Sequence, residues 1–377
     1  MRDLLLGLPV RDLDFAIEGD AVSLAREIAG ELGVRARVHG RFATATVEAG
    51  EGRLDFAATR SERYERPGAL PRVEPAPIME DLGRRDFSIH AMALPIAPAR
   101  PGRLLDPFSG REDLSRRRLR ILHVRSFEDD PTRAFRAARY ANRLRLAVEP
   151  ETRRAARRAA ASGFLDSISG DRRRRELALV FSEPRPAGAV RWMAKLGLLA
   201  TLHPSLPASA PVLARLRAAE RVATRLRKTT SWILYLLVWS FDLAPEAAEI
   251  LAGRLALAGE QRRILISWPA TAARLSGGGR PRRPSEVAGL RLSTNEIAAA
   301  AVCSLREDVE AMLRAELERE PVELSIRGRD LLRAGVSPGP SVGKALARTL
   351  AARRDGKIPR EAELEYALKA ARRPGAP

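Results

Sequence analysis

The sequence predicts an α+β protein in which a small mixed sheet with helices is followed by an all-α remainder. Short segments with the alternating apolar pattern of strands are confined to residues 1–112. From there on, Ala-, Leu- and Arg-rich segments with helical periodicity follow one another. We therefore expect a head at 1–112, a neck at 113–160, a helical body at 161–272 and a helical tail at 287–377.

Local signals place the elements of this plan. In the head, an amphipathic helix is expected at 21–33, because Gly33 is a typical helix terminator. Strands are expected around Asp12 and Asp14 and at 34–40, 44–49 and 52–59. Further helices are expected at 131–145, 150–162, 171–182, 186–199, 209–225, 230–241 and 245–256. The Gly-, Arg- and Pro-rich segment 276–286 is expected to be a linker.

The charge balance points to a polyanionic partner. Lys and Arg total 66 against 47 Asp and Glu, which gives a formal net charge of +19. Nucleic acid is the first candidate for such a protein, and an Arg-rich codon usage is the alternative. Aromatic residues make up only 5%, so stacking of bases on many rings is not the expected mode of binding.

The sequence offers no disulfide framework and no membrane span. A single cysteine, Cys303, fits a reducing cytoplasm, and no secretory signal is expected. The longest apolar run, 232–239, falls far short of the roughly 20 residues that cross a bilayer, so we expect a buried core helix there.

Two carboxylates near the start are candidate metal ligands. Asp12 and Asp14 alternate with Leu13 and Phe15, so both acids face the same side of a strand. Carboxylate oxygens suit Mg²⁺, and a pair of Mg²⁺ ions suits nucleotidyl transfer. Asp55 on a later strand is the candidate third acid. The alternative is a solvated edge strand with incidental acids.

The helix expected in residues 129–144 carries a second candidate site. Arg133, Arg136, Arg139 and Arg143 recur at helical spacing and form one stripe. A carboxylate beside a guanidinium complements the acceptor and amino group that cytosine and adenine share, whereas uracil and guanine present the opposite polarity. Asp130 with Arg133 would thus accept C and A. The alternative is a basic face that binds an RNA backbone nonspecifically.

Three segments together carry a resemblance to a known family: LLLGLPVRDLDFAIEG (4–19), MEDLGRRDFSIHAMAL (79–94) and the Asp-Asp-x-x-Arg of 129–133. They resemble the polymerase-β-like nucleotidyltransferases, and more narrowly the class II tRNA nucleotidyltransferases, which build or repair the CCA end of tRNA. The resemblance covers nearly the whole chain. It implies that residues 1–112 are the catalytic head and that the helical domains bind RNA.

The resemblance also implies roles for single residues. The triphosphate would be held by Arg2 and Arg85, and the nucleotide would be read and oriented by Asp130, Arg133, Arg136 and Arg139. Family members carry a glycine turn before the segment that matches Met1 and Arg2, so we expect a true start upstream or a fragment. Asn is usual where this chain has His90, and Gly where it has Ala43.

Further resemblances concern a loop, the body and the tail. Residues 59–73 resemble the family's flexible loop, which helps the site to accept the last A. Arg clusters in the body are expected to neutralise tRNA phosphates, or else to be solvated charged faces: Arg153, Arg157, Arg172 and Arg174. In the tail motif, Gly335 should end a helix before a rigid turn at 338–340.

The function expected from these observations is a cytoplasmic tRNA nucleotidyltransferase. It would add C, A or both from CTP and ATP to the 3′-hydroxyl of tRNA, with Mg²⁺ as cofactor and no membrane partner. Alternatives are a bacterial poly(A) polymerase, a dedicated CC-adding or A-adding enzyme, and a tRNA-binding protein with an inactive head.

Overall fold

The computed structural model divides into two compact units. The first comprises Met1–Ala208 with Gly253–Ala256, and the second Ser209–Ala252 with Leu257–Pro377. The residues that the structure describes are 1–10, 12–39, 43–50, 52–96, 102–226, 231–276, 283–304 and 307–372. The first unit contains the strands and the candidate site, and the second is helical. The finer division into head, neck, body and tail stays a prediction.

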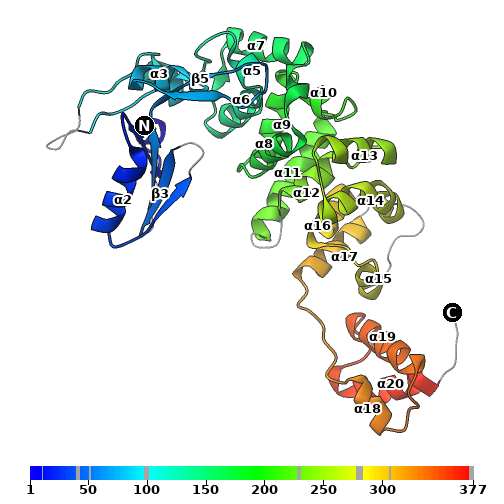
Figure 1. Ribbon diagram of the computed structural model, residues 1–377. Helices are drawn as coiled ribbons and strands as arrows, with labels where there is room; N and C mark the ends of the chain where they lie inside the picture. Colours follow the sequence, from blue (N-terminus) through cyan, green and yellow to red (C-terminus); the bar gives the residue numbers. More distant parts are fainter. Residues whose placement is uncertain are drawn as a thin grey trace. The chain divides into compact units, whose positions relative to one another are not determined.

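The head contains the mixed sheet that the sequence predicts (Figure 1). Its strands occur in the order β1 (Asp12–Ile17), β4 (Gly52–Ala58), β3 (Thr44–Ala49) and β2 (Ala36–His39). β1 runs parallel to β4, and the other neighbours are antiparallel. Helix α2 (Ala21–Glu31) packs on one face, and Asp20 caps it by accepting hydrogen bonds from the amides of Val22 and Ser23.

The core of the head lies between α2 and this sheet. Phe15 and Phe56 stack with ring centroids 4.9 Å apart, and the small residues Ala21, Ala25 and Ala29 let the helix approach them. Since strand side chains alternate, the residues between these apolar ones point to the opposite face. The packing of α2 therefore determines which face of the sheet is available for polar chemistry.

The segment after the sheet differs from expectation. The flexible loop expected at 59–73 is non-helical, as predicted, but its two ends form the antiparallel hairpin strands β5 (Arg60–Arg63) and β6 (Arg72–Pro75). Charged residues in these strands hide the alternation that marks most strands. Gly68 lies in the turn with φ +72°. The remaining short helices of this region are α1 (Arg2–Leu5), α3 (Ile78–Gly83), η2 (Ser88–His90) and α4 (Gly110–Ser115).

The rest of the first unit is almost entirely helical. Its elements are α5 (Ser126–Asp129), α6 (Thr132–Arg143), α7 (Pro150–Ala161), η3 (Phe164–Ser167), α8 (Gly170–Phe181), α9 (Pro186–Lys195) and α10 (Leu199–Leu202). Helix α6 packs against α8 and α9. At Gly188 an added Cβ would lie 2.0 Å from Asn142 Oδ1, so glycine permits the close approach of α9. Two short strands that the sequence does not predict, β7 (Arg118–Leu119) and β8 (Ala147–Val148), pair in parallel.

The second unit is built on buried helices. The apolar run becomes α12 (Trp232–Trp239), a core helix as predicted, and Trp268 donates a hydrogen bond to the carbonyl of Leu237. No helix among the described residues has the length and hydropathy to cross a membrane. The other helices are α11 (Ala210–Arg225), α13 (Pro245–Arg254), α14 (Gly259–Ser276), α15 (Pro284–Gly289), α16 (Thr294–Cys303), α17 (Glu307–Glu318), α18 (Gly328–Arg333), α19 (Pro340–Arg354), η4 (Arg360–Ala362) and α20 (Glu363–Arg372).

The sequence predicts two connections in this unit, a turn in the tail and a linker at 276–286. Gly335 follows α18 with φ +89°, and α19 begins at Pro340, so the turn expected in the tail is confirmed. Most of the linker expected at 276–286 lies outside the described residues.

Candidate active site

Three carboxylates lie together on the polar face of the head sheet. The parallel register of β1 and β4 sets Asp14 opposite Asp55 and Asp12 opposite Arg53. Asp12 and Asp14 are exposed, and all three acids are on the face away from α2. The structure thus places side by side the three acids that the sequence singled out as candidates.

Asp55 is anchored by its neighbours on the same face. Thr46 Oγ1 donates a 2.6 Å hydrogen bond to Asp55 Oδ1, and Arg53 Nε lies 2.8 Å from Asp55 Oδ2. In the part of the chain that the structure describes, no three His, Cys, Asp or Glu side chains converge as a closed metal cage. Mg²⁺ commonly binds through one or two carboxylates with waters and phosphate oxygens, so an open pair of acids is compatible with it.

A pocket of about 330 Å³ opens between the hairpin, the segment after α3 and the neck helix α6. This volume lies within the usual range for small-molecule sites. Its lining is strongly charged and comprises Glu62, Tyr64, Arg84, Arg85, Asp86, His90, Asp130, Arg133 and Arg136. Four residues expected to bind nucleotide therefore share one pocket.

The two residues expected to read the base have different hydrogen-bond partners. Arg133 is buried and donates to Ser126 Oγ at 2.8 Å and to the carbonyl of Arg84 at 2.6 Å. Asp130 Oδ1 accepts from Thr132 and, at 2.7 Å, from Arg172 Nη2. Both side chains are thus held in fixed orientations at the wall of the pocket.

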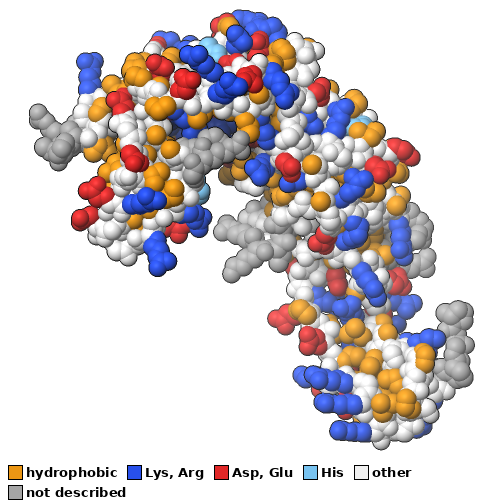
Figure 2. Space-filling model, in the orientation of Figure 1, with side chains coloured by type: hydrophobic (Ala, Val, Ile, Leu, Met, Phe, Trp, Pro, Cys, Tyr) orange, Lys and Arg blue, Asp and Glu red, His pale blue; other side chains and the backbone are white. Residues whose placement is uncertain are grey.

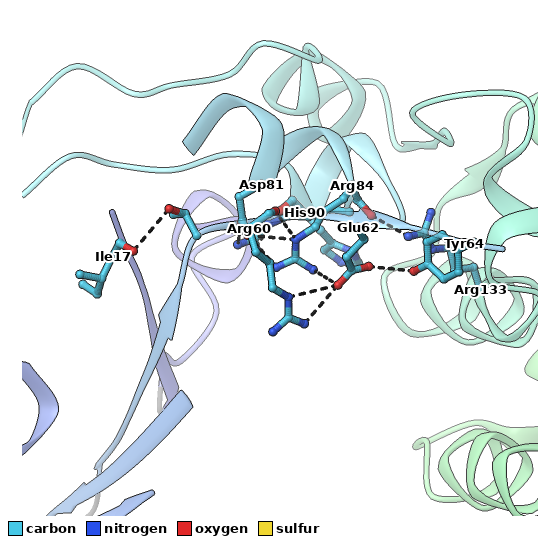
Figure 3. A network of polar contacts seen from close by, with 10 residues as sticks. Ile17, Arg60, Glu62, Tyr64, Asp81, Arg84, His90 and Arg133 are labelled. Atoms are coloured by element: carbon cyan, nitrogen blue, oxygen red, sulfur yellow. Dashed lines mark hydrogen bonds and ion pairs between the residues drawn. The ribbon is translucent and has the colours of Figure 1, made fainter. Parts of the chain in front are cut away.

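The carboxylate of Glu62, on the hairpin strand β5, accepts hydrogen bonds from other residues that line the pocket. Glu62 accepts from Arg84 Nη1 at 2.7 Å and from the Tyr64 hydroxyl at 2.7 Å (Figure 3). Burial raises the pKa of Tyr64, and the nearby Glu62 raises it further, so the hydroxyl stays protonated. Asp81 pairs with both Arg84 and Arg85, at 2.6 and 3.0 Å.

A chain of polar contacts runs from α1 to α6, and three of its members, Asp86, His90 and Arg136, line the pocket. Arg2 Nη1 lies 2.7 Å from His90 Nε2, His90 Nδ1 lies 2.7 Å from Asp86 Oδ1, and Arg136 Nε donates to Asp86 Oδ2 at 2.8 Å. Burial raises the pKa of Asp86, but His90 and Arg136 outweigh burial and hold it well below its ordinary value.

Arg139 lies beside this chain rather than in the pocket lining. Its guanidinium lies 4.9 Å from the centroid of the Tyr140 ring and forms an ion pair with Glu183 at 3.7 Å. Arg2 also stands over Tyr140, at 5.3 Å. Arg2 and Arg139 therefore approach the same ring from different elements.

The four arginines expected to contact tRNA have different surroundings. Arg153 is half-buried on α7, and Arg157 on the same helix is exposed and donates to the carbonyl of Lys195 at 2.9 Å. Arg174 pairs with Asp171 at 2.7 Å. Arg172 is turned toward the pocket, where it bridges Asp130 and the carbonyl of Gly68 in the hairpin turn.

Several residues of the site escaped the sequence reasoning. Thr46 and Arg53 share the strand face of Asp55, and the alternation of β3 and β4 could have identified them. Glu62 and Tyr64 lie in a segment interpreted as a loop. The contact of His90 with Arg2 joins residues 88 positions apart, and no local pattern signals it.

Comparison with known proteins agrees with this geometry. Residues 1–120 match the family model described as the poly A polymerase head domain, and residues 145–209 match the one described as a probable RNA and SrmB-binding site of polymerase A. The chain is 33% identical to a CC-adding tRNA nucleotidyltransferase of Deinococcus radiodurans, over 98% of this chain and 87% of that protein. It is also 33% identical to an A-adding tRNA nucleotidyltransferase of Geobacter sulfurreducens, of which it spans 44%.

Solved structures give the same result. A CCA-adding enzyme in an apo form aligns with a TM-score of 0.80 and 30% identity, over 98% of this chain and 89% of that one. The Thermotoga maritima CCA-adding enzyme complexed with tRNA aligns with a TM-score of 0.73 and 28% identity over the same shares. The α+β fold class predicted from the sequence is confirmed, and this chain belongs to the family of the tRNA nucleotidyltransferases.

Proposed function

We propose that this chain transfers cytidylate, adenylate or both from CTP and ATP to the 3′-hydroxyl of tRNA and releases pyrophosphate. The observation that carries the proposal is the pairing of an exposed, aligned set of carboxylates with a charged pocket in the same unit. A tRNA substrate places the proposed reaction in the cytoplasm.

Asp12 and Asp14 are the proposed ligands of Mg²⁺, with Asp55 as the third acid. The family generally uses divalent metals, and the exposed hard oxygens of β1 suit Mg²⁺ in particular. When bound, Mg²⁺ activates a hydroxyl nucleophile and stabilises the leaving pyrophosphate. The bonds from Thr46 and Arg53 hold Asp55 in one orientation beside Asp14.

The pocket is the proposed site of the nucleotide. Asp130 would accept a hydrogen bond from the amino group of cytosine or adenine, and Arg133 would donate to the neighbouring ring nitrogen. Arg85 lines the pocket and its side chain is one-third exposed (33%), so its guanidinium is available to a phosphate oxygen. Arg136, Arg139 and Arg2 supply further positive charge around the same region.

Arginines of α7 and α8 are the proposed contacts for the tRNA backbone. Arg153 and Arg157 lie on one helix and Arg174 on another, and each would meet phosphate without reading sequence. Arg172, expected in the same role, bridges Asp130 and Gly68 in this structure, which supports a part in the nucleotide pocket as well.

The test offers each labelled nucleotide separately to tRNA that lacks the whole CCA end, lacks only the last A, or is complete. Incorporation of C, of A or of both separates the CC-adding, A-adding and CCA-adding activities, and a long A tail would indicate a poly(A) polymerase. Asp12→Asn and Asp14→Asn should each lower incorporation about a thousandfold, because each removes a metal ligand.

A matched control lies on the same face of the sheet. Glu48 is an exposed acid on β3, opposite Arg53 in the register. Glu48→Gln removes the same charge without removing a proposed ligand, and it should retain incorporation within about threefold. Undiminished incorporation in Asp12→Asn or Asp14→Asn would refute the proposed metal site.

A further inference from the structure

His90 lies in the middle of the polar chain that connects α1 to α6. Its ring is half-buried in the pocket wall, with Arg2 of α1 2.7 Å from Nε2 and Asp86 2.7 Å from Nδ1. The ring also meets Tyr140 of α6 edge-on, with centroids 4.5 Å apart. Every polar atom of the imidazole therefore has a defined partner.

These partners determine the tautomer of the ring. A guanidinium can only donate hydrogen bonds, so Nε2 must accept from Arg2. An ionised carboxylate can only accept, so Nδ1 must carry the proton that faces Asp86. The neutral Nδ1–H tautomer satisfies both contacts, and protonation of Nε2 would set two donors against each other at 2.7 Å.

We propose that His90 is a positioning residue: as the neutral Nδ1–H tautomer it holds Nη1 of Arg2, whose Nε and Nη2 pair with Asp3, and protonation of its ring releases Nη1 from this contact. This inference rests on the proposed function in one respect, because it takes Arg2 as a phosphate-binding residue. The contact makes nucleotide binding depend on the protonation state of one imidazole.

The charges around the ring determine the pH range in which His90 becomes protonated. Arg2 faces it from α1, Asp86 from the segment after α3, and Arg136 with Tyr140 from α6. Burial lowers the pKa of His90, and Arg2 and Arg136 lower it further, against the opposing effect of Asp86. The ring is thus neutral at pH 7 and above, and Nη1 of Arg2 is released only below the ordinary histidine value of about 6.5.

The first experiment reads the tautomer directly in the full-length protein. Ring ¹⁵N chemical shifts at pH 7.5 should show one histidine with a protonated Nδ1 and a bare Nε2, and this signal should disappear in His90→Asn. The opposite tautomer, or a charged ring at that pH, would overturn the inference whatever the activity of the protein.

The second experiment measures the KM for nucleotide and kcat between pH 8 and 5.5. In the wild-type protein the KM should be constant above pH 6.5 and rise below it, by at most about tenfold at pH 5.5, because Nη1 of Arg2 loses its partner and the pKa of His90 lies below its ordinary value. His90→Asn should remove most of this rise, because an amide accepts from Arg2 and donates to Asp86 at every pH. His90→Leu can do neither, and its KM should be raised about tenfold already at pH 8.

A second histidine provides the matched control. His203 is buried in the body, and its Nδ1 accepts from the amide of Ser205, which an asparagine oxygen can also do. His203→Asn should keep the acid rise of the wild type. An unchanged rise in His90→Asn would overturn the proposal. Absence of incorporation by the wild-type protein would instead refute the proposed function, and the ring tautomer would still decide the present inference.

Discussion

In the proposed function, base selection depends on two side chains that other residues hold in place. Asp130 and Arg133 are three residues apart, yet Asp130 is oriented by Arg172 and Thr132, and Arg133 by Ser126. A pocket wall fixed in this way can discriminate between bases without a nucleic-acid template.

Substitution of Arg133 should therefore impair selection more than RNA binding. Arg133→Lys keeps the charge but loses the planar fork, and it should reduce the preference for CTP and ATP over UTP and GTP about tenfold. The ratio of kcat/KM values for the four nucleotides measures this change. Arg153→Ala is the control, since it should weaken tRNA binding and leave the ratios unchanged. Equal losses of selection and tRNA affinity in Arg133→Lys would contradict the assignment.

The chain of contacts around Asp86 also predicts how stability depends on pH. The folded pKa of Asp86 lies below its unfolded value, so its contribution is present above about pH 4 and is lost as the pH falls further. The folded pKa of His90 lies below its unfolded value too, so stability begins to fall below about pH 6.5, where the unfolded chain binds the proton.

Asp86→Asn should separate these two contributions. It breaks the ion pair with Arg136, so the free energy of unfolding at pH 7 should decrease. The part of the acid destabilisation that sets in near pH 4 should become shallower. Urea unfolding at pH 7, 5 and 4 checks this, and an equally steep decline in the variant would show that other carboxylates govern acid unfolding.

At the scale of elements, the sequence predicts what local patterns encode. The helices of the first unit begin close to the expected residues because caps and prolines mark them, as Ser169 does for α8 and Glu149 with Pro150 for α7. β5 and β6 were missed because charged residues interrupt their apolar alternation, and one of these, Glu62, is paired with Arg84 from another segment. β7 and β8 depend on tertiary contacts between distant segments.

The same limit applies to the candidate site. Strand alternation alone places Asp12 and Asp14 on one face, and helical spacing places Arg133 and Arg136 on one stripe. The position of Asp55 beside Asp14 depends on the register of two strands. The hydrogen-bond partners of these residues come from other elements and could not be derived from local spacing. The sequence thus predicts which side chains carry the chemistry, but not what orients them.

The residue just before β3, Ala43, has a left-handed backbone conformation that alanine disfavours. Ala43 has φ +48°. The left-handed region costs a non-glycine residue roughly 1–2 kcal/mol, whereas a glycine loses up to about 1 kcal/mol more backbone entropy on folding. Ala43→Gly should therefore stabilise the head by about 0.5–1 kcal/mol.

Native-state hydrogen exchange of the β3 and β4 amides measures this effect where it arises. Ala45→Gly is the control in the same strand, because Ala45 is buried and lacks a positive φ. It should accelerate exchange, whereas Ala43→Gly should slow it. Faster exchange in both variants would show that the left-handed residue is not a source of strain.

For the whole molecule, the excess of arginine has two uses. Lys and Arg side chains are scattered over the visible surface, among acidic and hydrophobic ones (Figure 2). Other arginines are consumed inside the protein: Arg133 and Arg173 are buried and donate to backbone carbonyls. The net charge of +19 therefore overstates the number of cationic side chains that can contact phosphate. The salt dependence of tRNA binding measures how many of them do so.

The salt dependence of tRNA binding should distinguish the two classes of arginine. Each phosphate that the protein neutralises contributes about 0.7–0.9 to the slope of log K against log salt. Arg153→Gln should lower the slope by about this amount, if Arg153 meets phosphate as proposed. Arg314→Gln is the matched control, because Arg314 of α17 is already paired with Glu310 at 2.7 Å. It should leave the slope unchanged, and equal decreases in both variants would indicate a diffuse attraction rather than a defined phosphate contact at α7.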